Sequence, residues 1–198
     1  MIHHFWDWDD SIAMSRNALY LSYKKVLEEY DKIIDFEYFN NFIYQDSGIY
    51  LSEVCNFSEK EIIKIKKKKE DFYFNFFFND IRFIWPEYDI NEKYYIVSNT
   101  NTNLIKKLIK KYDSYHNSNH LEKFQILGTS SNCKEVIKRK PAPDLYINAF
   151  DMWINKMNSD DLLHIYEDSP EGLKSAADFA IKYKNKITNL HIHHVKNK

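Results

Sequence analysis

The stretch that decides the fold is His3-His4-Phe5-Trp6-Asp7-Trp8-Asp9-Asp10-Ser11, near the amino-terminal end of the sequence. Apolar residues lead up to Asp7 and Asp9, which are two positions apart. Side chains alternate along an extended strand, so both carboxylates would project to the same side. If the chain turns directly after the strand, the two acids lie at its carboxyl end, where parallel α/β sheets bind their ligands. Two carboxylates this close repel unless a cation or a proton intervenes, so the stretch predicts half of a metal-assisted site.

Length and composition fit one domain with a sizeable core, or a core with a small inserted module. The 198 residues include 29 acidic and 28 basic side chains, and this balance gives no argument for a nucleic acid or an anionic membrane as a partner. We expect a soluble, cytoplasmic protein, because no charged and then apolar leader opens the sequence and no apolar run is long enough to span a bilayer. The two cysteines are too few for a disulfide framework and are expected to be reduced thiols. Nothing in the composition predicts the oligomeric state.

The chain after the first expected strand, residues 2–8, falls into two parts. Residues 15–85 predict only helices, including one from about Ser15 to Tyr30 with helical apolar spacing, one over 35–50, and one that begins at Ser58 with Glu61 three positions later. From residue 94 onward strands and helices alternate, which predicts a parallel sheet covered on both faces. The strands expected there are 94–99, 124–128, 162–166 and 190–195, and the helices are 103–112, 143–157 and 171–183.

Four short pieces carry candidate chemistry, each at the end of an expected strand or in an adjoining loop. They are Asp7-Trp8-Asp9-Asp10-Ser11, Ser98-Asn99, Lys140-Pro141-Ala142-Pro143-Asp144 and Glu167-Asp168-Ser169-Pro170-Glu171-Gly172. In this order they resemble the motifs of the haloacid-dehalogenase-like (HAD) hydrolase superfamily, which are DxDx(T/S), a strand ending in Ser or Thr, a lysine, and an acidic pair. The runs KPAPDLY and EDSPEGLKSA resemble the branch with a helical cap, which includes phosphoglycolate-phosphatase-like and beta-phosphoglucomutase-like proteins.

The resemblance covers the whole chain, because the expected helical insert falls where that branch carries its cap. It implies an α/β fold with a Rossmann-like parallel sheet sandwiched by helices, formed by residues 1–14 and 86–198, and an all-helical cap at 15–85. It also implies a phosphatase that acts on a small phosphorylated metabolite, with neither nucleic acid nor membrane as a partner. The cap would close over the site and exclude bulk water during the reaction.

The residue types agree with this chemistry, because phosphoryl transfer mainly needs positioning and positive charge around a loose, highly charged transition state. Asp7 is the candidate nucleophile that forms an aspartyl-phosphate, and Asp9 is the candidate acid and base. Ser98 and the backbone amide of Asn99 would hold the phosphate. Lys140 would offset the charge of the phosphate and of Asp7.

Mg²⁺ is the expected cofactor. Neighbouring strands lie about 4.8 Å apart, so carboxylates from the ends of two of them can share one ion with bonds of about 2.1 Å. The expected ligands are Asp7, the backbone carbonyl of Asp9, and Asp168. Glu167 would bind directly or through water.

Three of the departures from the family pattern bear on the candidate site or on the substrate. Asp10 stands where a glycine usually follows the second Asp, and we expect it to point to solvent. Trp8 is bulky between the two acids, and we expect it to pack inside. Leu19 stands where the mutase members carry a cap histidine, which argues against a sugar-phosphate mutase.

Other functions stay open at this point. A nucleotide phosphatase or a phosphotransferase of the same fold would use the same residues, and a catalytically silent HAD-like binding protein would retain them without turnover. A dehalogenase needs neither a proton donor for its leaving halide nor a metal, so it would leave Asp9 and Asp168 without a role.

Several other clusters have plain structural interpretations. The run Lys66–Lys69 has acidic neighbours and is expected to be a solvated surface. The aromatic run Phe72–Phe78 is expected to fill the core of the insert, and Cys133 is expected to be inert. His191 and His193 share one face of an expected strand, which makes a zinc site conceivable.

Overall fold

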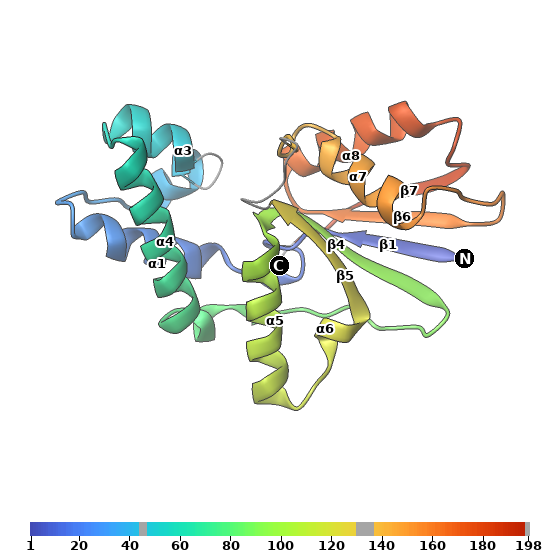
Figure 1. Cartoon of the computed structure of the whole chain (residues 1–198), viewed down its shortest axis with the longest axis horizontal. Coiled ribbons are helices and arrows are strands. Elements are labelled where there is room, and N and C mark those ends of the chain that lie inside the picture. Colours follow the sequence, from blue (N-terminus) through green and yellow to red (C-terminus); the bar gives the residue numbers. More distant parts are fainter. Residues whose placement is uncertain (44–46, 130–136, 197–198) are drawn as a thin grey trace. The chain divides into compact units, whose positions relative to one another are not determined.

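The chain folds into two compact units, Met1–Ala13 with Phe83–Lys198, and Met14–Arg82. The computed structural model describes residues 1–43, 47–129 and 137–196. The first unit contains a parallel sheet with helices, and the second is built mainly of helices (Figure 1). The chain passes between the units at two short strands, β2 (Ala13–Met14) and β3 (Arg82–Phe83), which pair with each other.

Five parallel strands form the sheet of the first unit, in the order β5-β4-β1-β6-β7. The strands are β1 (Ile2–Trp6), β4 (Glu92–Asn101), β5 (Phe124–Thr129), β6 (Leu162–Glu167) and β7 (Asn189–His194). Phe5 in the central strand pairs with Tyr95 on one side and Ile165 on the other. The predicted α/β fold with a parallel sheet is therefore confirmed. Each strand begins or ends within two residues of the predicted bounds.

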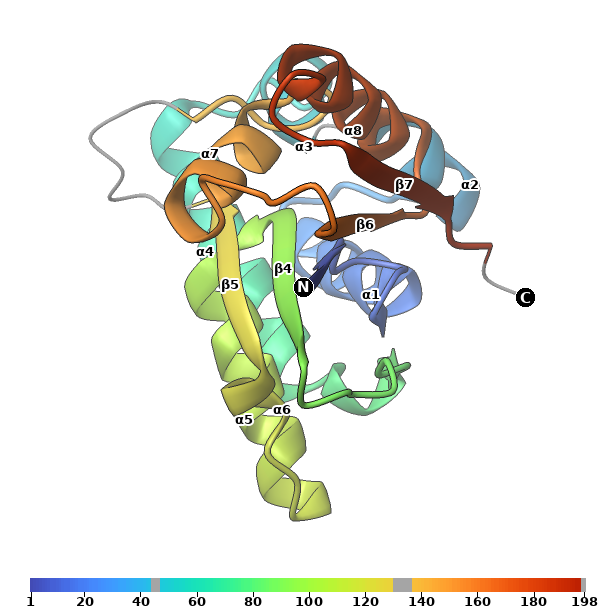
Figure 2. The ribbon, with the colours of Figure 1, turned by 90° about the vertical axis from the view of Figure 1, so that its right-hand side faces the viewer.

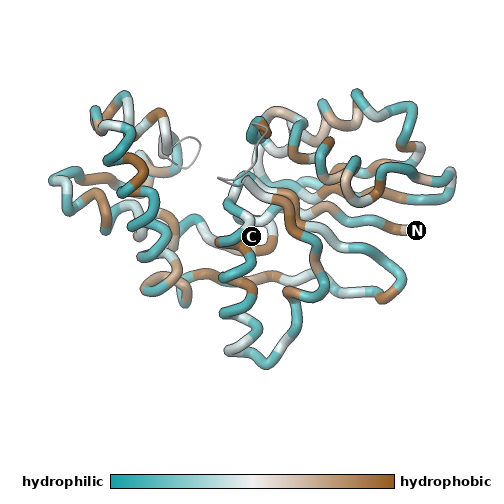
Figure 3. Tube along the Cα trace, in the orientation of Figure 1, coloured by the Kyte–Doolittle hydropathy of each residue, from teal (hydrophilic) through white to brown (hydrophobic). Residues whose placement is uncertain are grey.

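Helices cover both faces of this sheet. They are α5 (Thr102–His116), α6 (His120–Lys123), α7 (Asp144–Trp153) and α8 (Pro170–Tyr183). Helices α7 and α8 lie together over one face, and α5 lies beside β4 and β5 on the other (Figures 1 and 2). Phe5, Leu163 and Ile165 pack with Phe150 of α7 and Phe179 of α8 in the main core. Figure 3 shows hydrophobic segments, in brown, within the strands of this sheet.

The second unit contains two long helices and several short helical turns. Its elements are α1 (Arg16–Glu28), α2 (Phe36–Tyr38), η1 (Phe39–Ile43), α3 (Ser47–Ile49), η2 (Tyr50–Val54), α4 (Glu59–Asn75) and η3 (Phe78–Asp80). The predicted start at Ser58 is confirmed, because its side chain accepts a hydrogen bond from Glu61 N while Glu61 Oε2 accepts one from Ser58 N. The described residues of the helix expected over 35–50 are helical from residue 36 onward, in α2, η1, α3 and the first residue of η2, while residues 44–46 lie outside the described part of the chain.

The core of the second unit includes Val26, Leu51 and Ile65, all fully buried. The aromatic run at 72–78 contributes only in part, since Tyr73 is buried but 69% of Phe76 is exposed. Of the two cysteines, Cys55 is a buried free thiol and Cys133 lies outside the described residues. No helix in the described part of the chain is both long and apolar enough to cross a membrane.

Candidate active site

Asp7 stands directly after β1 at the carboxyl end of the sheet. Its backbone N–H donates a hydrogen bond of 3.0 Å to Tyr166 O, which holds it level with the end of β6. The chain then turns at once, because the carbonyl of Trp8 accepts hydrogen bonds from the three backbone amides of residues 11–13. The strand therefore ends at Trp6 and is shorter than the expected range 2–8. Because Asp7 and Asp9 lie beyond it, the alternation of side chains along a strand does not set the direction of Asp9.

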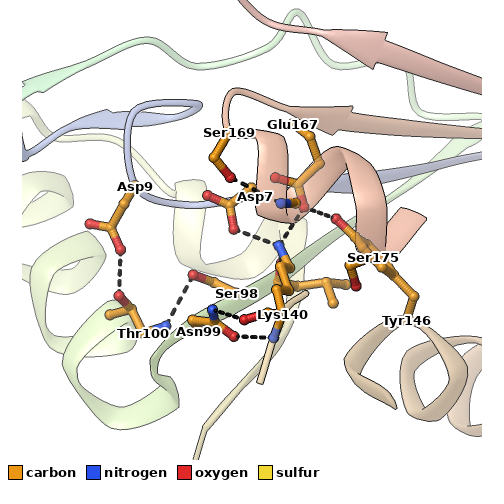
Figure 4. Close-up of polar contacts among 12 residues, drawn as sticks. Asp7, Asp9, Ser98, Asn99, Thr100, Lys140, Tyr146, Glu167, Ser169 and Ser175 are labelled. Carbon is orange, nitrogen blue, oxygen red and sulfur yellow. Dashed lines mark hydrogen bonds and ion pairs between the residues drawn. The ribbon is translucent and has the colours of Figure 1, made fainter. Parts of the chain in front are cut away.

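Asp9 points away from Asp7. Thr100 Oγ1 donates a hydrogen bond to Asp9 Oδ2 on the far side of the loop (Figure 4). The expectation that Asp10 points to solvent is wrong, because only 6% of this residue is exposed. Its φ of 57° is left-handed, a conformation that Asp tolerates better than most residues, and its amide donates to Ala13 O. The turn thus folds Asp10 back into the protein. Trp8 is fully buried, as predicted.

Lys140 joins three parts of the chain at one buried point (Figure 4). Its Nζ lies 2.6 Å from Asp7 Oδ1, 2.6 Å from Glu167 Oε1 and 2.7 Å from the carbonyl of Val97. Burial alone lowers the pKa of an ammonium group, but the charges of Asp7 and Glu167 outweigh it and hold the pKa of Lys140 above its ordinary value. Lys140 is therefore a permanent positive charge between two carboxylates.

Glu167 is the most enclosed acid of the group, with none of its surface exposed. Burial raises its pKa to about 7, against the opposing pull of Lys140. Its Oε1 also accepts a hydrogen bond from the hydroxyl of Tyr146 in α7. Its Oε2 is buried without a hydrogen-bond partner in the described part of the chain, and a Cβ added to Gly172 would lie 1.8 Å from that oxygen. Only glycine therefore leaves room for this carboxylate beside α8.

The end of β4 adds two polar residues. Ser98 is 1% exposed, and its Oγ accepts a hydrogen bond of 3.1 Å from Thr100 N. The side chain of Asn99 holds the backbone of Lys140, because Oδ1 accepts from Lys140 N at 2.8 Å and Nδ2 donates to Lys140 O at 3.2 Å. The sequence predicted a role only for the backbone amide of Asn99. The structure adds that its side chain fixes the lysine loop.

Asp7, Glu167 and Asp168 form the candidate metal site. Each offers a carboxylate oxygen, and the three oxygens lie within 4.8 Å of one another. Opposite ligands around Mg²⁺ are about 4.2 Å apart, so small side-chain shifts bring all three onto one ion. Carboxylates are ligands that Mg²⁺ prefers, and the orphaned Oε2 of Glu167 is an acceptor that a cation would satisfy. The residues therefore fit the expected ion. The carboxylate of Asp9 is not part of this group.

No family model matches the sequence, and no curated protein matches it either. Solved structures do match the fold. A beta-phosphoglucomutase from Clostridium difficile has 21% identity and a TM-score of 0.67, covering 98% of this chain and 92% of its own. An Entamoeba histolytica HAD hydrolase of family IA, variant 3, has 17% identity and a TM-score of 0.67, with 98% and 93% covered. A proposed phosphoglycolate phosphatase from Lactobacillus plantarum has 14% identity and a TM-score of 0.66, with 97% and 94% covered. The chain has the HAD-like fold.

The HAD-like fold explains which predicted residues meet. The three acids of the metal group converge because β1 and β6 are neighbours and both end at the same edge of the sheet, and Lys140 reaches them from the loop that precedes α7. Sequence reasoning missed two residues, Thr100 and Tyr146. Thr100 lies just beyond the expected strand 94–99, where the register between β4 and β5 shifts, so strand alternation does not place it. No sequence signal predicts that Tyr146 reaches Glu167, since this contact depends on how α7 packs against the sheet.

Proposed function

We propose that the protein is a Mg²⁺-dependent phosphatase that hydrolyses a small phosphorylated metabolite through an aspartyl-phosphate on Asp7. The observation that carries this proposal is the place of Lys140 Nζ, 2.6 Å from both Asp7 Oδ1 and Glu167 Oε1. It puts a fixed positive charge beside the nucleophile and beside the acidic metal group at the same time. Phosphoryl transfer requires such charge around the transferred group. The likeness to HAD structures supports the fold on which this arrangement rests.

In the first half-reaction a carboxylate oxygen of Asp7 attacks phosphorus, and the bond from phosphorus to the substrate oxygen breaks. Lys140 stabilises the charge on the carboxylate and on the transferring phosphoryl group. The hydroxyl of Ser98 and the backbone amide of Asn99 hold the phosphoryl oxygens. A Mg²⁺ ion bound by Asp7, Glu167 and Asp168 would supply further positive charge that reduces the repulsion between the two anions.

Asp9 is the general acid and the general base of the reaction. It donates a proton to the leaving oxygen, and it later takes one from the water that attacks the phosphoaspartate. That attack breaks the bond between phosphorus and Asp7, releases inorganic phosphate and restores the carboxylate. Because Asp9 accepts a hydrogen bond from Thr100 in the structure, its carboxylate has to turn away from Thr100 before it can act. The Thr100 hydroxyl therefore holds Asp9 in a resting position.

Hydrolysis of an aryl phosphate tests the proposal. We expect turnover with Mg²⁺, loss of turnover with EDTA, and recovery when Mg²⁺ is returned. Asp7→Asn should abolish turnover, Asp9→Asn should reduce the rate about 10²–10⁴-fold, and Lys140→Ala about 10²–10³-fold. Asp178→Asn, an equally conservative change on the surface of α8, is the matched control and should keep full activity.

Activity retained by Asp7→Asn would refute this nucleophile. A wild-type protein that hydrolyses neither the aryl phosphate nor any member of a panel of phosphorylated sugars, small acids and nucleotides would instead be a silent member of the fold. The same panel separates a metabolite phosphatase from a nucleotide phosphatase. We propose that selection among such substrates belongs to the helical unit Met14–Arg82, because the described catalytic groups all lie in the other unit.

A further inference from the structure

Two histidines face each other across the last two strands of the sheet. His164 Nδ1 of β6 lies 2.8 Å from His193 Nε2 of β7. Leu163 and Ile165, on either side of His164, pack into the core beneath α7 and α8. Because side chains alternate along a strand, His164 points to the opposite face of the sheet. Strands β6 and β7 lie side by side at that edge of the unit (Figure 2).

A third histidine belongs to the same group. His191 precedes His193 by two positions in β7, so the two share one face, and it pairs in register with His164. The ring centroids of His191 and His164 are 5.3 Å apart. His191 is exposed, and the rings it contacts are those of His164 and His193, so its side chain has room to turn toward the other two. Two histidines of β7, one residue apart, therefore lie beside one histidine of β6.

The imidazoles that face each other are neutral at physiological pH. Burial, with the nearby imidazoles of His4, His193 and His191, lowers the pKa of His164 to about 4, and burial also lowers the pKa of His193. A neutral imidazole has one nitrogen lone pair that can bind a metal ion. In the hydrogen-bonded pair, the two nitrogens at 2.8 Å share a single proton. A divalent ion can take the place of that proton.

The neighbouring polar groups do not compete for this position. His4 stacks on His164 with a centroid distance of 5.2 Å, but its Nε2 contacts Glu92 Oε2 at 2.8 Å and its Nδ1 contacts the hydroxyl of Tyr166 at 3.3 Å. Both nitrogens of His4 are thus engaged elsewhere. The ring of His4 supports the ring of His164 and leaves the edge that faces β7 available.

We propose that His164, His193 and His191 form a binding site for a divalent transition-metal ion of the Zn²⁺ type, separate from the acidic group at the carboxyl ends of the strands. Zinc binds imidazole nitrogen at about 2.0–2.1 Å, so two ligands of a tetrahedral site are about 3.3 Å apart. The His164–His193 pair needs to widen by about half an ångström to reach that spacing. His191 supplies the third nitrogen after it turns, and water can occupy the fourth position.

Such an ion would cross-link the edge of the sheet. In the described sheet β7 has β6 as its single neighbour, so a metal bridge between them ties down the last strand. Imidazole ligands favour Zn²⁺ and related ions, whereas the carboxylates of the other site favour Mg²⁺. The two sites therefore differ in chemistry as well as in position, and the proposal stands whether or not the protein is a phosphatase.

Zinc titration in excess Mg²⁺ tests the proposal, because Mg²⁺ keeps the acidic group occupied. We expect the wild-type protein to bind one equivalent of Zn²⁺ against a chromophoric chelator, and to bind Co²⁺ with the visible absorption of tetrahedral nitrogen coordination. His164→Gln and His193→Gln should each weaken Zn²⁺ binding by about 10²-fold or more, and His191→Gln by about tenfold. His116→Gln, an exposed histidine at the end of α5, is the control and should leave the affinity unchanged.

A metal-dependent melting temperature gives a second readout. Binding to the folded state alone raises the stability, so Zn²⁺ should raise the melting temperature of the wild-type protein and not that of His193→Gln. If a buried substitution prevents folding, the exposed His191→Gln variant still reports the effect. Stoichiometric binding that His164→Gln and His193→Gln leave unchanged would overturn the proposal, and so would a wild-type protein that binds no Zn²⁺ in excess Mg²⁺.

Discussion

At the scale of single residues, the candidate site depends on how buried charges are compensated. Lys140 and Glu167 have almost no exposed side-chain surface, and Asp7 has little. Removing one partner of such a buried pair costs about 3–5 kcal/mol, because the remaining charge has no compensation. Glu167 has a second donor in Tyr146, which also lies beneath the ammonium of Lys140 at 4.9 Å from its ring centre. Tyr146 therefore supports both members of the pair without taking part in the proposed chemistry.

Tyr146→Phe should lower the free energy of unfolding by about 1.5–3 kcal/mol, the value of a hydrogen bond to a buried charged group. Urea denaturation measures it. Tyr183→Phe is the matched control, because the hydroxyl of Tyr183 donates to Asp151 from the same core cluster but Asp151 itself is exposed. Loss of this hydrogen bond should lower the free energy of unfolding by about 1 kcal/mol or less. Equal costs for the two variants would show that Tyr146 does not compensate a buried charge.

At the scale of elements, β6 carries two different environments on its two faces. Leu163 and Ile165 pack in the core, while His164 faces three other histidines from β1 and β7, namely His4, His191 and His193. Glu92 of β4 is the acidic group that acts on His164, and it opposes the lowering of the pKa. The net result is a pKa of about 4, below the ordinary 6.5. This face of the sheet is therefore sensitive to acid.

The stability of the metal-free protein should fall as the pH is lowered from about 6.5 to 4. Between these values an unfolded chain binds a proton at residue 164 and the folded chain does not, so the free energy of unfolding rises with pH across this window. Above pH 6.5 the contribution of His164 to stability is fully present. With allowance for solvent screening, His164 should account for about 1–2 kcal/mol of the loss. Urea denaturation at several pH values with EDTA measures the slope.

His164→Gln should flatten this slope, because it removes the group that takes up the proton. His116→Gln, which changes an exposed histidine of α5, should leave the slope as it is in the wild-type protein. If the two variants show the same dependence on pH, the acid sensitivity does not come from this face of the sheet. Both variants carry the same substitution, so a general effect of losing a histidine is excluded.

At the scale of the whole molecule, the sequence predicts most of what depends on strand ends. Asp7, Glu167 and Asp168 could be placed together because each lies at a strand end, and parallel strands end at one edge of a sheet. Lys140 lies in the loop between β5 and α7, and only the order of the four motifs placed it with them. The direction of Asp9 could not be predicted. It depends on the turn that follows the end of β1 at Trp6, in which the carbonyl of Trp8 accepts the amides of residues 11–13 and the backbone of Asp10 is left-handed.

In the helical unit, local sequence signals predict the two long helices but not the segment between them. Apolar spacing predicted α1 and the cap at Ser58 predicted α4, since both signals are local. The described part of the segment between them forms short α- and π-helical elements, and its residues Phe39 and Leu51 pack with Ile65 of α4 in the core of the unit. Local preference does not specify such packing. The contact of Tyr146 with Glu167 belongs to the same class, because it needs the docked position of α7.

The division into two units leads to a prediction about excision. Every residue of the candidate site lies in the first unit, and the chain leaves and re-enters that unit at adjacent points, since Ile84 N donates a hydrogen bond of 2.8 Å to Ile12 O. A short Gly/Ser linker from Ala13 to Phe83 closes this gap at small entropic cost. The shortened protein should fold cooperatively and bind Mg²⁺, as circular dichroism melting and Mg²⁺ titration would show.

The shortened protein should still hydrolyse an aryl phosphate but lose discrimination within the metabolite panel, because the part proposed to select substrates is gone. The same linker with Asp7→Asn is the control for residual activity. A shortened protein that folds and binds Mg²⁺ yet keeps the full discrimination would place substrate selection in the sheet unit.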